Sequence, residues 1–294
     1  MKDAFSDYHP MIILIYFLSV LGFTMFLHHP VCLGIAVLSA TVYSICLCGR
    51  RGAGFSIRYL LPMAGMILLI NPLINHQGLT ILGYFPNGNP FTLEAILYGF
   101  MAAGILIALI QWFSCWNQIM TTDKLVYLFG RVMPAFSLVI SMTLRFVPRY
   151  RQHFKKVMDA QRQLGTDQGR TGLYTRIRTG IRVLSGTLTW AIEHAVETGD
   201  SMKSRGYGLP GRTAFSLYRW TRRDTIVLAV ILLLSGVVIA GILQGRLYWT
   251  CFPTIRGADT DLFTISIYIS YGILSLLPIL LHGREALRWN HSFR

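Results

Sequence analysis

Long apolar runs with few charges constrain this sequence most. A helix that crosses the hydrocarbon core of a bilayer needs about 20 apolar residues, because only a helix or a closed barrel satisfies its own backbone there. Six runs approach or meet this length: Met11–Leu27, Val31–Cys48, Tyr59–Leu73, Thr92–Trp116, Thr225–Leu243 and Leu262–Leu281. They predict an all-α, polytopic membrane protein with about six transmembrane helices.

The composition agrees with this fold class. Charged residues make up 14% of the chain, against about a quarter in ordinary soluble domains, and the mean hydropathy is +0.49. Lys2, Asp3 and Asp7 stand before the first run and no small-residue cleavage pattern follows it, so that run is expected to be retained as a helix.

Basic charge is concentrated between the fourth and fifth runs. The 79 residues from Arg145 to Arg223 hold 16 of the 27 Lys and Arg, but only five Asp and Glu. This clustering beside membrane segments suits the positive-inside rule better than nucleic-acid binding, for which no fingerprint is present. The segments 1–119, 120–223 and 224–294 are therefore expected to be N-terminal membrane helices, a cytoplasmic region and C-terminal membrane helices.

The orientation of the chain in the membrane follows from the distribution of Lys and Arg among its loops. With a cytoplasmic N-terminus, every strongly basic loop falls on one side of the membrane, and the loop 75–90, which has no Lys or Arg, falls on the other. The chain is therefore expected to be a multi-pass protein of the plasma membrane with both termini in the cytoplasm.

The basic region contains two long amphipathic helices by its apolar periodicity. The first is expected to begin at Pro134, bend near Pro148 and end near Leu164, and the second carries an apolar stripe from Ile177 to Met202. Helices of this kind can lie on lipid. The carboxylates of Glu193, Glu197 and Asp200 favour a protein partner instead.

No constellation for catalysis, a metal or a cofactor is recognisable. The segment Gly206–Thr213 resembles a phosphate-binding loop, but Arg212 replaces the Lys and the segment closes a helix instead of opening one. It is interpreted as a helix terminator, so no ATP site, cofactor or metal is expected in this chain, and the protein is not expected to be an enzyme.

Arg205 stands between Ser204 and Gly206, which have little side-chain bulk. An Arg in such a setting can insert into a groove of another protein and offer its planar guanidinium to a carboxylate. The alternative is that a cation at a helix C-terminus only complements the helix dipole. From this residue alone, the two interpretations are equally good.

The order and spacing of several motifs make the chain similar to the transmembrane T component of energy-coupling factor (ECF) transporters. The motifs are Asn71-Pro72-Leu73, Leu144–Pro148, Ala160-Gln161-Arg162 and, above all, Ser204–Gly208 with Arg212-Thr213. The resemblance implies a subunit without catalysis of its own. Its two cytoplasmic helices would couple two ABC ATPase subunits to a substrate-binding membrane protein, the S component, for uptake of a vitamin or a metal ion.

The resemblance also implies two ATPase-docking motifs. The second is Ser204, Arg205 and Gly206. The first lies at Arg162, Gln163, Leu164 and Gly165, where this chain has Leu164 at the position of the family's Arg. Arg162 lies about 200° away around a helix and cannot simply substitute. Two alternatives to this function are a lipid-modifying membrane enzyme with a basic face and a membrane scaffold.

Overall fold

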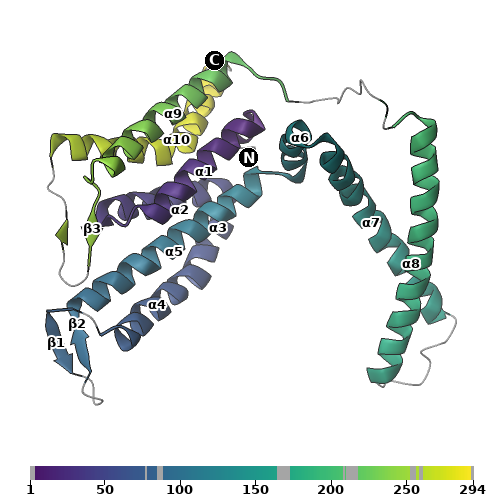
Figure 1. The fold of residues 1–294 in the computed structure, drawn as a ribbon, viewed down its shortest axis with the longest axis horizontal. Coiled ribbons are helices and arrows are strands. Elements are labelled where there is room, and N and C mark those ends of the chain that lie inside the picture. Colours follow the sequence, from purple (N-terminus) through teal and green to yellow (C-terminus); the bar gives the residue numbers. More distant parts are fainter. Residues whose placement is uncertain are drawn as a thin grey trace. The chain divides into compact units, whose positions relative to one another are not determined.

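The computed structural model describes residues 4–76, 78–84, 89–163, 173–207, 209, 218–251, 256–257 and 261–292. The chain divides into two compact units (Figure 1). Residues 1–124 and 218–294 form one, here called the membrane unit. Residues 125–217 form the other, here called the helix-pair unit.

The membrane unit confirms the predicted all-α architecture. Its main helices are α1 (Pro10–Phe26), α2 (Pro30–Cys48), α4 (Leu61–Ile74), α5 (Leu93–Ile119), α9 (Arg222–Leu243) and α10 (Leu262–Ser292). Five described segments are long and apolar enough to cross a membrane, and α1 is a shorter apolar helix of 17 residues.

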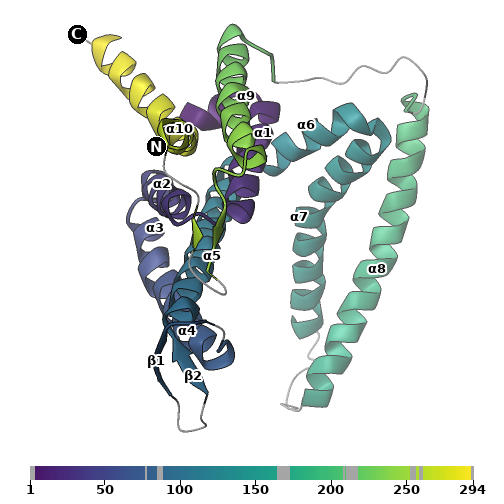
Figure 2. The same ribbon diagram turned by 60° about the vertical axis from the view of Figure 1, so that its left-hand side comes forward.

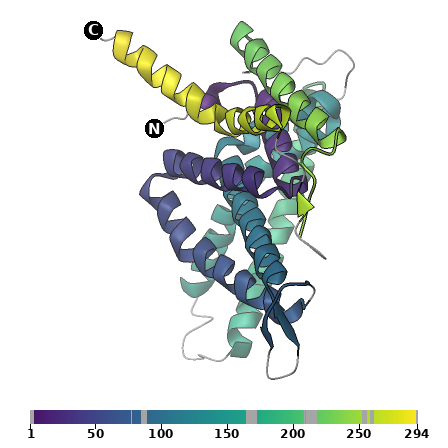
Figure 3. The same ribbon diagram turned by 90° about the vertical axis from the view of Figure 1, so that its left-hand side faces the viewer.

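Two predicted boundaries differ from the structure. The third segment begins at Gly52 instead of Tyr59, because short α3 (Arg50–Phe55) and the π-helical turn η2 (Ser56–Leu60) lead directly into α4. Gly49, with φ of +58°, makes the turn between α2 and α3, so that Arg50 and Arg51 form the start of α3. The last helix, α10, continues past Leu281, and its C-terminal half runs away from the rest of this unit (Figure 3).

Short hairpins occupy two of the connections. β1 (Ile81–Tyr84) pairs with β2 (Pro90–Thr92), and β3 (Trp249–Thr250) pairs with β4 (Arg256–Gly257), both antiparallel. Thr92 holds the N-cap position of α5, but its side chain makes no capping hydrogen bond. Instead, the backbone N–H and the hydroxyl of Thr80 donate to the Glu94 carboxylate in the first turn.

Aromatic side chains fill the centre of the membrane unit. Trp112 of α5 is fully buried, and its ring lies 6.1–6.2 Å from those of Tyr16 and Phe17 of α1 and Tyr43 of α2. All ring pairs are edge-to-face or tilted, which is the favourable arrangement for aromatic rings. This cluster holds α1, α2 and α5 together.

The N-terminal segment makes hydrogen bonds close to both connections between the units, at Lys124 and at Asp224. The buried ammonium of Lys124 donates to the carbonyls of Ser6, at 2.7 Å, and Ile119, at 3.0 Å. The backbone N–H of His9 donates to Asp224, at 3.3 Å, and Asp224 also accepts from the Thr221 backbone and hydroxyl in a capping box.

The helix-pair unit consists of two long helices and most of a short one. The short helix is α6 (Thr122–Val132). α7 (Pro134–Gln163) begins at the predicted proline, and α8 is Leu173–Ser204. α7 continues through Pro148. α7 and α8 lie side by side and antiparallel, as Figures 1 and 2 show.

Candidate functional site

A ladder of stacked rings joins α7 to α8. His153 of α7 stacks on Trp190 of α8 with ring centroids 3.9 Å apart and planes 5° apart, and His194 lies 5.2 Å from the same indole at 10°. Phe146 meets His194 edge-on at 6.0 Å, and Tyr150 meets Trp190 edge-on at 5.8 Å. These five residues recur every three or four positions, so each helix presents one face to the other.

The apolar stripe predicted for α8 lies mostly outside this contact. Val183 and Thr187, on the ladder side of the helix, are its buried residues. The stripe residues Ile177, Ile181, Leu184, Leu188 and Ile192 are each 56–63% exposed. Five large aliphatic side chains along one helix are therefore left without a partner in their own unit, which indicates a surface for association.

The end of α8 is a Schellman motif. Gly206 has φ of +74°, its N–H donates to the Lys203 carbonyl, and the Tyr207 N–H donates to the Met202 carbonyl. These bonds make Arg205 the last residue before the left-handed glycine. The predicted helix end is confirmed at Gly206, and it fixes where Arg205 leaves the helix; Gly208 and residues 210–213 of the predicted terminator lie outside the described residues.

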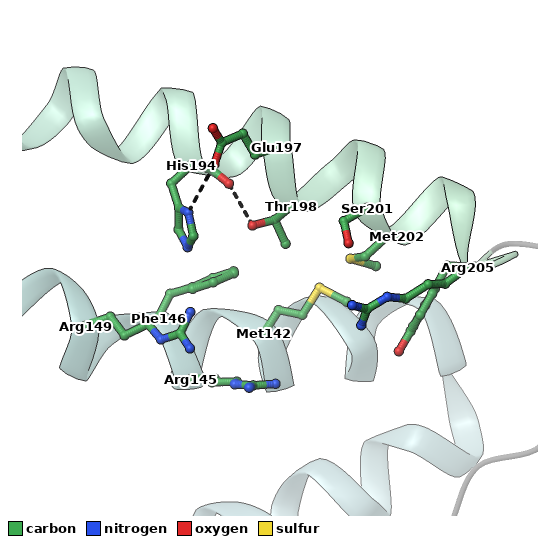
Figure 4. Close-up of a pocket in the computed structure, with 11 residues that line it drawn as sticks. Met142, Arg145, Phe146, Arg149, His194, Glu197, Thr198, Ser201, Met202 and Arg205 are labelled. Carbon is green, nitrogen blue, oxygen red and sulfur yellow. Dashed lines mark hydrogen bonds and ion pairs between the residues drawn. The ribbon is translucent and has the colours of Figure 1, made fainter.

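Arg205 lies at one end of a groove between α7 and α8. The groove has a volume of about 390 Å³, and Figure 4 shows the Arg205 side chain lying back along it toward Met142. Two arginines of α7, Arg145 and Arg149, line the same groove. Both belong to the basic region of the sequence, which alone did not reveal that they border α8.

The remaining groove residues are apolar or locally bonded. The Nδ1 of His194 lies 3.9 Å from the Glu197 carboxylate, and the Thr198 hydroxyl donates to the His194 carbonyl at 2.7 Å (Figure 4). Ser204 is exposed and its hydroxyl donates to the Ser201 carbonyl at 2.9 Å. It thus completes the helix end instead of reaching into the groove.

The first predicted motif lies at the other end of the helix pair. Arg162 and Gln163 are exposed in the last turn of α7, and Arg162 approaches Asp159 at 3.9 Å. Leu164 and Gly165 lie outside the described residues. Because α7 has 30 residues and rises about 1.5 Å per residue, the helix is about 45 Å long, and Arg162 lies near the end opposite to the groove that Arg205 lines.

The described part of the chain holds no cluster of three or more His, Cys, Asp or Glu that could bind a metal. Two buried carboxylates of the membrane unit, Glu94 and Asp224, accept hydrogen bonds at the first turns of α5 and α9. Each carboxylate therefore stabilises the N-terminus of its helix.

Comparison with known proteins places the chain in a family. The profile of CbiQ, described as cobalt transport protein, matches residues 6–217. This is most of the chain, and the protein belongs to this family of membrane transport proteins.

Among the relatives are proteins named energy-coupling factor transporter transmembrane protein EcfT. The chain is 38% identical over 104 residues to that of Lactobacillus helveticus, covering 35% of this chain and 38% of the relative. It is 35% identical over 105 residues to EcfT 1 of Listeria monocytogenes (35% and 40%), and 31% identical over 123 residues to EcfT of Listeria innocua (42% and 45%). The matched part thus spans about two fifths of the length of these relatives.

Proposed function

We propose that this protein is the transmembrane energy-coupling subunit of an ECF-type ABC importer. It would transmit the ATP-driven motion of two cytoplasmic ATPase subunits to a separate substrate-binding membrane protein, and would carry no catalytic residue itself. The observation that supports this most is the position of Arg205, fixed by a Schellman end on a long helix of a CbiQ-family chain.

The two ends of the helix pair are proposed to dock the two ATPase subunits. Arg205, with Ser204 and Gly206 beside it, would insert into a groove of one subunit. The first motif, Arg162 to Gly165, would contact the other, with Leu164 making an apolar contact where the resemblance to the T component implies Arg. Because the aromatic ladder joins α7 to α8, motion at one end would be carried along the pair.

The exposed aliphatic stripe of α8 is proposed to receive the substrate-binding membrane protein. Its five side chains form a continuous apolar surface, which suits a partner that is itself apolar. The vitamin or metal ion would be selected by that partner.

The basic loops support an orientation in the plasma membrane. We propose that both termini and the region 120–223 are cytoplasmic, between membrane segments at 1–119 and 224–294, because this places the positive loops inside. Anionic lipid head groups at that face would add to the attraction.

Reversal of charge at Arg205 tests the proposal. In the chain purified in mild detergent with its two ATPase subunits and its substrate-binding protein, Arg205→Glu should abolish ATPase retention and coupled uptake. Arg182→Glu, an equal change at an exposed position of the same helix, should retain both. A wild-type chain that elutes alone and is active alone would refute the proposed function.

The first motif gives a second test. Leu164→Arg restores the residue expected from the resemblance, so uptake should be unchanged or improved. A clear loss of uptake would mean that the end of α7 does not dock in the proposed way.

A further inference from the structure

Three arginines line the groove at the end of α8. Arg145, Arg149 and Arg205 line it, and none of them has a carboxylate within ion-pair distance in the part of the chain that the structure describes. Elsewhere in this unit, Arg162 and Lys203 each approach an aspartate at 3.9 Å. The one carboxylate lining the groove, Glu197, approaches His194 instead.

Three guanidinium groups around one small cavity repel each other unless an anion lies between them. Arg145 and Arg149 are one turn apart on α7, and Arg205 reaches the groove from α8 (Figure 4). A carboxylate would turn this repulsion into attraction and can be gripped by two nitrogens of one Arg.

The walls between the arginines indicate that this carboxylate belongs to a polypeptide. Met142, Phe146, Met202 and Tyr207 contribute apolar and aromatic surface to the groove. Thioether and ring surfaces adapt to apolar side chains, and a free inorganic anion would not use them. The groove is also continuous with Arg205, the residue proposed to dock an ATPase subunit.

We propose that the α7–α8 groove is the binding site for an acidic segment of an ATPase subunit, and that Arg145 and Arg149 hold the same segment as Arg205. This inference rests on the proposed function and adds to it that docking uses both helices. A partner bound only to α8 would strain the aromatic ladder whenever it moved. A partner bound to α7 and α8 together moves the pair as one body.

The first test removes the α7 charges from the groove. In the full complex with its two ATPase subunits, the double variant Arg145→Gln/Arg149→Gln should weaken ATPase retention about tenfold or more and reduce the salt dependence of binding. The control is Arg151→Gln/Lys155→Gln, which removes the same charge from exposed α7 positions outside the groove. The control should stay within about twofold of wild type.

The second test identifies the occupant directly. A photo-crosslinking amino acid at Met142, in the groove, should join to an ATPase peptide that contains Asp or Glu. The same group at Leu188, on the exposed stripe, should not join to that peptide. Crosslinking of position 142 only to lipid, or to no ATPase peptide in an intact complex, would overturn the inference.

The outcomes separate the two proposals. Should the ATPase subunits fail to associate with the wild-type chain, the proposed function is wrong. When they associate with the wild type and equally well with both double variants, the proposed function stands and the groove inference is refuted.

Discussion

The membrane unit and the helix-pair unit use aromatic residues in contrasting ways. In the membrane unit, Trp112 is enclosed by rings from other helices, and none of its surface is exposed. In the helix-pair unit, Trp190 lies between two histidines in a single seam, and the aliphatic side chains beside it face outward. The first arrangement makes a self-sufficient core. The second makes a stiff element whose other surfaces are free for partners.

The largest expected effect tests this contrast directly. Trp112→Ala should destabilise the membrane unit by about 3 kcal/mol or more, because it leaves a cavity among fixed rings. Trp190→Ala should leave the thermal unfolding of the membrane unit nearly unchanged while lowering coupled uptake. Thermal unfolding in detergent measures the stability of the membrane unit, and transport into proteoliposomes measures coupled uptake. Equal losses of stability for both variants would contradict the contrast.

The next effect concerns the place where the units are joined. Lys124→Met removes a buried ammonium that donates to Ser6 and Ile119, and strands their carbonyls. The expected loss is about 1.5–3 kcal/mol. Uptake should fall while ATPase retention persists, because Arg205 is untouched. Lys156→Met, at an exposed position of α7, should change neither.

A smaller and local effect is expected at the end of α8. Gly206→Ala forces a side chain into a left-handed conformation at a cost of about 1–2 kcal/mol. ATPase retention should fall several-fold as Arg205 is displaced, with little change in global unfolding. Gly199→Ala is the matched control, since a Cβ there meets nothing within 4 Å and alanine favours a helix. If Gly199→Ala lowered ATPase retention as much as Gly206→Ala does, the Schellman motif would have no specific role in docking.

The sequence predicted which segments form helices far better than it predicted which helices contact one another. Apolar runs and helix starts such as Pro134 are local signals, so the helices and the end at Gly206 could be predicted from composition and spacing. The groove could not be predicted, because Arg149 and Arg205 line the same groove only in one register of α7 against α8. The i, i+4 spacing of Arg145 and Arg149 was the available signal, but it does not say which helix they face. Likewise, Thr80 holds Glu94 through a loop whose path no periodicity reveals.

The smallest effect expected is a pH dependence at His29, which contrasts with the ladder histidines because it caps a membrane helix. Its Nδ1 accepts from the Val31 N–H, the Tyr268 hydroxyl lies 3.1 Å from its Nε2, and burial lowers its pKa from the ordinary value of 6.5. The folded protein therefore prefers neutral His29. Its contribution is present above pH 6.5 and is lost as the pH falls through the lowered pKa. In His29→Asn, which keeps a capping acceptor, unfolding temperatures at pH 7.5 and 5.5 should differ less than in wild type; an unchanged difference would assign the pH dependence to other groups.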